Sequence, residues 1–121
     1  GAYQYAMDTV VLPALYRFKP DIILVSSGFD SSYADPLGCI MLSSEAYASI
    51  TSQLITAAND LCGGRLVYTH EGGYSKDYVP YCGLAVIETL CGVKTPVIDC
   101  YLEEVRSWGY QSLQPHQKCV I

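Results

Sequence analysis

The chain has 121 residues, of which 50% are apolar and only 16% charged, and its formal net charge is -5. This length suits one domain with a single core, and the large apolar share excludes an intrinsically disordered chain. The seven Lys and Arg residues are scattered singly, so we expect no direct nucleic-acid binding. No apolar run approaches the roughly 18 residues of a membrane span, so we expect no membrane protein. Because few residues are charged, a partner or further polypeptide is expected to cover part of the surface.

Helix and strand patterns alternate from the start of the chain. Apolar residues recur at helical spacing over 2–18, and Lys19-Pro20 ends that pattern because the residue before proline disfavours the α region. The next run, over 21–27, is short, β-branched and apolar on both faces. Such a run is typical of a strand buried between two helix layers of a parallel sheet.

The same alternation continues through the second half. The remaining elements are predicted, in chain order, as a helix over 44–61 capped by Ser43 and ended by Gly63-Gly64, a strand over 65–69, a helix over 77–91 and a short helix over 99–108. The order predicts an α/β fold. In such folds ligands bind beyond the carboxyl ends of the strands, so the loops after the two strands are the candidate site.

Six cysteines are present, with no Cys-x-x-Cys pair and no histidine spaced to complete a zinc cluster. Their apolar neighbours favour reduced, partly buried thiols in an intracellular protein, and a disulfide framework is the alternative. Cys119 is third from the end, whereas prenylation needs a cysteine fourth from the end, so lipidation is excluded.

Each candidate loop contains glycine and one residue able to do chemistry. Asp30 follows the first strand in Gly28-Phe29-Asp30 and has the chemistry of a metal ligand or general base, although an aspartate there is more often a turn former or a helix N-cap. Tyr74 ends Glu71-Gly72-Gly73-Tyr74 and is able to donate a hydrogen bond to developing negative charge, with a packing tyrosine as the alternative. No phosphate-binding loop, dinucleotide fingerprint or nucleophile elbow is present.

Three ordered segments carry a family resemblance: residues 18–30, Asp35-Pro36-Leu37-Gly38 and Glu71-Gly72-Gly73-Tyr74. Together they closely resemble the C-terminal third of the zinc-dependent histone deacetylase family, in its class II branch, over about residues 3–93. The resemblance implies part of an arginase-like three-layer α/β/α domain with a mostly parallel sheet. It also implies hydrolysis of N-acetyl-lysine amides in histones or other proteins, in the nucleus or cytoplasm. Residues 1–121 would form the C-terminal part of one such domain, with 94–121 as its last helix and tail.

The resemblance assigns roles residue by residue. It makes Asp30 a zinc ligand and Tyr74 the catalytic residue whose hydroxyl stabilises the oxyanion. The substrate-channel residues would be Leu37, Gly72, Gly73 and Phe29, and Phe29 and Asp35 would support the metal loop. Tyrosine at 74, where class IIa enzymes have histidine, is more similar to class IIb deacetylases and to acetylpolyamine amidohydrolases.

Several parts of the family's site are absent from this sequence. Its Asp-x-His ligands and paired histidines lie upstream, and neither His70 nor His116 has that context; His70 also departs from the usual aliphatic residue. With one zinc ligand, the chain alone is expected to be inactive and to need the N-terminal part of its domain. The alternatives are a non-catalytic interaction or regulatory module, and an amidohydrolase acting on acetylated polyamines.

Overall fold

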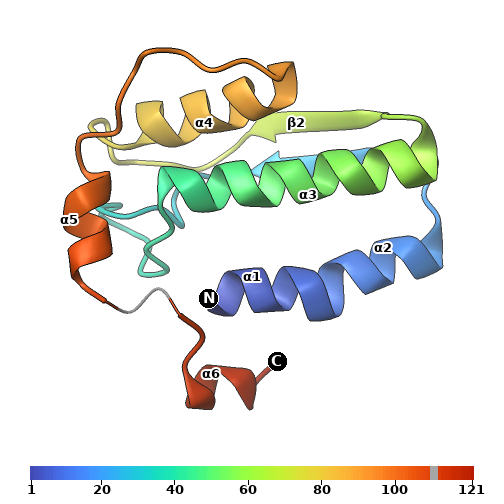
Figure 1. Ribbon diagram of the computed structural model, residues 1–121, viewed down its shortest axis with the longest axis horizontal. Helices are drawn as coiled ribbons and strands as arrows, with labels where there is room; N and C mark the ends of the chain where they lie inside the picture. The colour runs from blue at the N-terminus through green and yellow to red at the C-terminus, as the bar shows by residue number, and fades with distance from the viewer. Residues whose placement is uncertain (110–111) are drawn as a thin grey trace.

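The computed structural model describes residues 1–109 and 112–121, and Figure 1 shows helices packed against two strands. In chain order the elements are α1 (Ala2–Ala6), a π-helical turn (Met7–Val11), α2 (Leu12–Phe18), β1 (Ile23–Ser27), α3 (Ser44–Cys62), β2 (Leu66–His70), α4 (Val79–Cys91), α5 (Leu102–Ser107) and α6 (Pro115–Lys118). This order confirms the predicted α/β class.

The helix boundaries follow the predicted signals closely. The Ser43 hydroxyl accepts a hydrogen bond from the Ala46 amide at 3.3 Å and caps α3, which ends at Gly63 in the left-handed region with φ of 60°. Lys19 is also left-handed and ends α2 immediately before Pro20. Within the described ranges, no helix is long and apolar enough to span a bilayer.

Two details of the helices differ from the predictions. The expected helix over 2–18 contains a π-helical turn between α1 and α2, which apolar spacing does not reveal. The expected helix over 99–108 is shorter, because α5 covers Leu102–Ser107, and the tail contains the unpredicted short helix α6, whose first residue is Pro115. Proline suits a first helical turn because it has no amide hydrogen to leave unpaired.

The two strands are parallel, with Ile23 opposite Leu66 and Ser27 opposite His70. Parallel strands end at the same edge of a sheet, so their exit loops meet. The Glu71 amide donates to the Ser27 carbonyl at 3.1 Å, and the Phe29 amide donates to the Gly72 carbonyl at 2.7 Å. The predicted meeting of the two loops is therefore confirmed.

The core has two clusters of buried side chains. One lies between β1 and α3, where Ile23 packs against Ala57, Ala58 and Cys62. The other lies under the exit loops and contains Phe29, Tyr47, Tyr78, Cys82 and Val86. The second cluster matters for function because it supports the backbone from which the candidate residues project.

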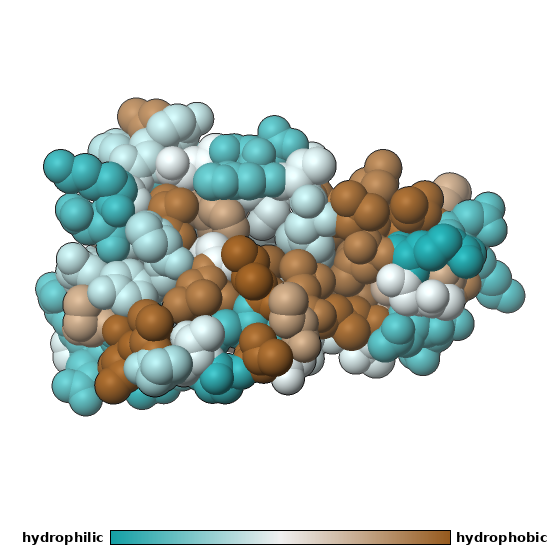
Figure 2. Space-filling view, turned by 90° about the horizontal axis from the view of Figure 1, so that it is seen from above, coloured by the Kyte–Doolittle hydropathy of each residue, from teal (hydrophilic) through white to brown (hydrophobic). Residues whose placement is uncertain are grey.

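The prediction that the first strand is buried on both faces is wrong for this chain. Ile23 and Val25 pack against the described helices, but Leu24, on the opposite face of β1, is 71% exposed. Figure 2 shows a second, separate apolar area, on the side of the molecule where α4 lies in Figure 1. The sequence pattern shows that the side chains of β1 are apolar. Burial on both faces also requires a helix layer over each face of the sheet, and the described residues supply a layer over one face only.

The cysteines form no disulfides, and all six lie within the described ranges. Cys62 and Cys82 are buried, while the other four are exposed: Cys39, Cys91, Cys100 and Cys119. The expectation of partly buried thiols therefore holds for two of the six. Apolar neighbours in the sequence do not bury a cysteine that lies on the solvent-facing side of its helix or in an exposed loop.

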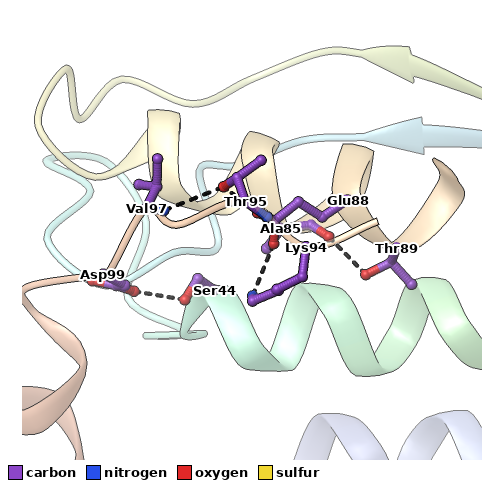
Figure 3. Close-up of polar contacts among 8 residues, drawn as sticks. All are labelled: Ser44, Ala85, Glu88, Thr89, Lys94, Thr95, Val97 and Asp99. Atoms are coloured by element: carbon purple, nitrogen blue, oxygen red, sulfur yellow. Dashed lines mark hydrogen bonds and ion pairs between the residues drawn. The ribbon is translucent and has the colours of Figure 1, made fainter. Parts of the chain in front are cut away.

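Two acidic side chains fix the segment between α4 and α5 (Figure 3). The buried carboxylate of Glu88 accepts hydrogen bonds from the Lys94 ammonium and the Thr95 amide, each at 2.8 Å, and from the Thr95 hydroxyl. Asp99 accepts a hydrogen bond from the Ser44 hydroxyl at 2.6 Å. These contacts tie the segment to α4 and to the start of α3.

Replacing Glu88 by glutamine is expected to lower the free energy of unfolding at neutral pH, because the amide lacks both the charge and one acceptor oxygen. Hydrogen bonds from Lys94 and Thr95 lower the pKa of Glu88 from 4.5 to about 2. A carboxylate with a lowered folded-state pKa stabilises the fold above its unfolded-state pKa, and this stabilisation is lost as the pH falls toward the folded-state value.

Urea unfolding at about pH 7 and about pH 3 measures this effect, and the difference between the parent and Glu88→Gln should shrink in acid. Glu103→Gln, at an exposed position on α5, is the matched control. Equal destabilisation by the two variants at neutral pH would contradict the prediction.

Candidate functional site

Asp30 lies immediately beyond β1, half-buried, with its carboxylate between two glycine backbones. A Cβ atom at residue 28 would lie 2.8 Å from one carboxylate oxygen, and a Cβ at residue 72 would overlap the other. Gly28 and Gly72 therefore leave the space that the carboxylate occupies. No hydrogen bond engages this carboxylate within residues 1–109 and 112–121, so its oxygens are available to a ligand from outside the described chain.

Tyr74 follows two glycines on the neighbouring loop. Gly73 has φ of 134°, and a Cβ there would lie 2.8 Å from the Cβ of Phe29, so both conformation and space require glycine. The Tyr74 side chain is 57% exposed, whereas the core tyrosines Tyr47 and Tyr78 are 8% and 0% exposed. This exposure argues against a packing role for Tyr74.

Asp35 joins the two loops. One of its carboxylate oxygens accepts hydrogen bonds from the amides of Leu37 at 2.8 Å and Gly38 at 3.0 Å, and the other accepts from the amide of Tyr74 at 2.8 Å. Burial raises the pKa of the Asp35 carboxyl, but the backbone N–H groups of both loops outweigh that effect and hold the pKa below its ordinary value of 3.8. Asp35 thus stays ionised and accepts hydrogen bonds from both loops.

Leu37 and Phe29 flank these loops in different environments. Leu37 is 73% exposed, on a turn whose backbone Asp35 fixes. Phe29 is buried, with ring centroids 5.2 Å from Tyr47 and 5.1 Å from His70. The structure therefore makes Phe29 an anchor of the Asp30 loop, and its place in a channel wall stays a prediction.

The donor set for a metal is incomplete in the described residues. No cluster of three or more His, Cys, Asp or Glu side chains suited to a metal occurs among them. His70 is exposed and packs against Phe29, and His116 lies on α6 at the other end of the chain. An unpaired carboxylate suits zinc as one oxygen ligand. Asp30 therefore fits as one ligand, and further ligands would have to come from outside the described chain.

Sequence reasoning did not identify one contributor to the site. Tyr47, on α3, donates a hydrogen bond from its hydroxyl to the Gly28 carbonyl at 3.3 Å and packs on Phe29. Burial raises the pKa of Tyr47, so its hydroxyl keeps its proton at neutral pH. The apolar stripe of α3 extends to this position at helical spacing from Ile50 and Leu54, and this spacing was the signal available in the sequence.

A protein-family model described as "Histone deacetylase domain" matches residues 1–90. Among curated proteins, the chain is 53% identical over 98 residues to a histone deacetylase-like amidohydrolase of Pseudomonas aeruginosa, covering 81% of this chain and 26% of that protein. It is 39% identical over 93 residues to the histone deacetylase clr3 of Schizosaccharomyces pombe, covering 77% of this chain and 13% of that protein. The chain thus spans about a quarter or less of these relatives.

Solved structures give the same match at the level of the fold. The chain superposes on the HDA15 HD domain with a TM-score of 0.69 at 34% identity, covering 88% of this chain and 30% of that one. It superposes on the histone deacetylase Clr3 with a TM-score of 0.76 at 30% identity, covering 98% of this chain and 18% of that one. The described fold is therefore similar to a part of each of these structures.

Proposed function

Because the chain belongs to the histone deacetylase domain family, we propose that it is part of a zinc-dependent enzyme that hydrolyses N-acetyl-lysine amides in histones or other proteins. One observation carries the proposal. An unpaired carboxylate, Asp30, and an exposed tyrosine, Tyr74, project from two loops that meet at one sheet edge and share the carboxylate of Asp35. This is the arrangement expected for acid, base or electrophilic chemistry at the carboxyl ends of parallel strands.

Each site residue has a specific role in this reaction. Asp30 would be one zinc ligand, and zinc, when bound, would polarise the acetyl carbonyl and activate water. Tyr74 would donate its hydroxyl proton in a hydrogen bond to the amide oxygen as that oxygen gains negative charge. Gly72 and Gly73 would border the substrate channel and leave room for the Asp30 carboxylate and the Cβ of Phe29. The exposed Leu37 would contact the methylene groups of the acetylated lysine.

The remaining ligands and the general base would come from an upstream part of the same domain, with residues 1–121 as its C-terminal part. The exposed apolar face of the sheet supports this proposal, because a second layer of polypeptide would bury Leu24 and its neighbours. The six free thiols suit a reducing compartment, and we propose the nucleus or cytoplasm.

Two other functions are alternatives to this proposal. One is hydrolysis of small acetylated amines such as polyamines; the relative at 53% identity is named a histone deacetylase-like amidohydrolase, a name that fits hydrolysis of either kind of amide. The other is a non-catalytic interaction or regulatory module. The former keeps the same chemistry, whereas the latter predicts no hydrolysis even when an upstream part is supplied.

An assay with an acetylated lysine peptide tests the proposal. The chain joined to an upstream part that supplies the missing ligands is expected to release acetate in a zinc-dependent manner, and the chain alone is expected to release none, because one carboxylate cannot hold a catalytic zinc. A chelator-treated sample is the control, and an acetylated polyamine is the competing substrate. Turnover by the isolated chain would contradict the proposal, as would failure of the complete domain to hydrolyse either substrate.

A further inference from the structure

We propose that Asp35 is a positioning residue that holds the Tyr74 hydroxyl where amide hydrolysis requires it, an inference that rests on the proposed function. Asp35 would not touch the substrate. It acts through the backbone of Tyr74, whose amide donates to Asp35 at 2.8 Å. The family resemblance connects Asp35 only with the metal loop, so its contact with the tyrosine loop is a finding of the structure.

The Tyr74 side chain has little else to hold it. It is 57% exposed, and its hydroxyl makes no hydrogen bond within the described residues. The preceding Gly73 has φ of 134°, a region where glycine alone is unstrained and where no side chain restricts the backbone. The position of the hydroxyl therefore depends on how firmly the backbone of residue 74 is held.

Asp35 is suited to hold that backbone. Its side chain is buried, and ionised acceptors form hydrogen bonds roughly twice as strong as neutral ones. Because the same planar carboxylate also accepts from Leu37 and Gly38, it sets the spacing between the leucine turn and the tyrosine loop. Gly38 in turn packs so closely on the Asp30 carbonyl that a Cβ there would collide with it. One buried group thus links Asp30, Leu37 and Tyr74.

The substitution Asp35→Asn tests this role in the complete deacetylase domain. The asparagine amide has one acceptor oxygen, whereas the carboxylate has two. The amide nitrogen must therefore face either the Leu37 turn or the Tyr74 amide. The backbone N–H groups on that side lose their hydrogen-bond acceptor. We expect kcat per folded, zinc-loaded molecule to fall about 10- to 100-fold with a much smaller change in KM, since displacement of a reacting group by about 1 Å can cost that much. A rise in KM with unchanged kcat would overturn the role.

Asp77→Asn is the matched control, because it makes the same exchange at an exposed site three residues after Tyr74. It should leave kcat and KM unchanged. If Asp35→Asn fails to fold, Asp35→Glu replaces it, because the longer side chain keeps both acceptor oxygens but displaces them by one methylene group. Asp35→Glu should also lose kcat, and full activity in that variant would overturn the positioning role.

A double-mutant cycle separates positioning from general structural support. If Asp35 acts through the Tyr74 hydroxyl, adding Asp35→Asn to Tyr74→Phe should lower kcat by less than about 2-fold, because the group to be positioned is already gone. A purely structural Asp35 would impose its full loss in the Tyr74→Phe background as well. That outcome would overturn the proposal.

Amide hydrogen exchange gives a readout that does not depend on activity. Exchange should be faster in Asp35→Asn than in the parent and in Asp77→Asn, either at the Tyr74 N–H or at the N–H groups of Leu37 and Gly38, depending on which set the amide nitrogen faces. If Tyr74→Phe keeps normal turnover, the proposed function is contradicted. The positioning role of Asp35 in catalysis is then contradicted as well, even if amide exchange is faster in Asp35→Asn. If Tyr74→Phe is impaired and Asp35→Asn is fully active, only the positioning role has failed.

Discussion

Replacing Tyr74 by phenylalanine is expected to lower the kcat of the complete domain about 100- to 1,000-fold, which corresponds to roughly 2.7 to 4 kcal/mol of lost transition-state stabilisation. The physical reason is the loss of one hydrogen-bond donor aimed at the amide oxygen as it becomes negative. Zinc content, KM and folding should change little, because the ring is exposed and its hydroxyl makes no hydrogen bond within the described residues. The measurement is steady-state turnover per folded, zinc-loaded molecule.

Two tyrosines elsewhere in the chain are controls for this experiment. Tyr16→Phe removes an exposed hydroxyl that donates to Asp60 on α3 and should leave turnover unchanged. Tyr78→Phe removes a buried hydroxyl that donates to Asp99 at 3.0 Å and accepts from the Ser44 amide at 3.1 Å. It should cost about 1 to 3 kcal/mol of stability and no turnover per folded molecule. If Tyr74→Phe follows the pattern of Tyr78→Phe, Tyr74 is a packing residue.

The elements of the fold were predictable because their signals are local. Ser43 predicted the start of α3 since a hydroxyl there accepts a backbone hydrogen bond, and Gly63 predicted its end since glycine adopts positive φ freely. The β-branched run of β1 predicted a parallel strand, and the topology of such sheets predicted that the loops carrying Asp30 and Tyr74 would meet. These inferences require no knowledge of packing between distant residues.

The parts that could not be predicted depend on distant contacts. The hydrogen bond from the Tyr74 amide to Asp35 joins residues that are 39 positions apart, and no local pattern identifies it. The exposure of Leu24 also depends on what packs over the sheet, which an apolar run cannot report. The glycines at 28 and 72 are intermediate cases. The sequence shows that residues 28 and 72 are glycines. Only the structure shows why glycine is required there, because the Asp30 carboxylate occupies the space that a Cβ would need.

Replacing Asp30 by asparagine is expected to reduce the zinc content of the complete domain and to abolish most of its activity. Substitution of groups that merely hydrogen-bond to a metal ligand typically costs about 10- to 100-fold in metal affinity or activity, so loss of a charged ligand should cost at least as much. Zinc content by elemental analysis and turnover at saturating peptide are the two measurements. Asp60→Asn, at an exposed site on α3, is the matched control and should preserve both.

The same substitution should leave the stability of the metal-free domain unchanged or slightly higher. Asparagine has nearly the shape of aspartate, so it fits between Gly28 and Gly72 without new overlap. Desolvating a half-buried carboxylate that accepts no hydrogen bond within the described residues lowers the stability of the folded state, and desolvating a neutral amide lowers it less. A residue kept for folding would instead destabilise the domain when changed. Thermal unfolding of the metal-free proteins therefore distinguishes the two roles, and a clear loss of stability in Asp30→Asn together with normal zinc content would remove Asp30 from the metal site.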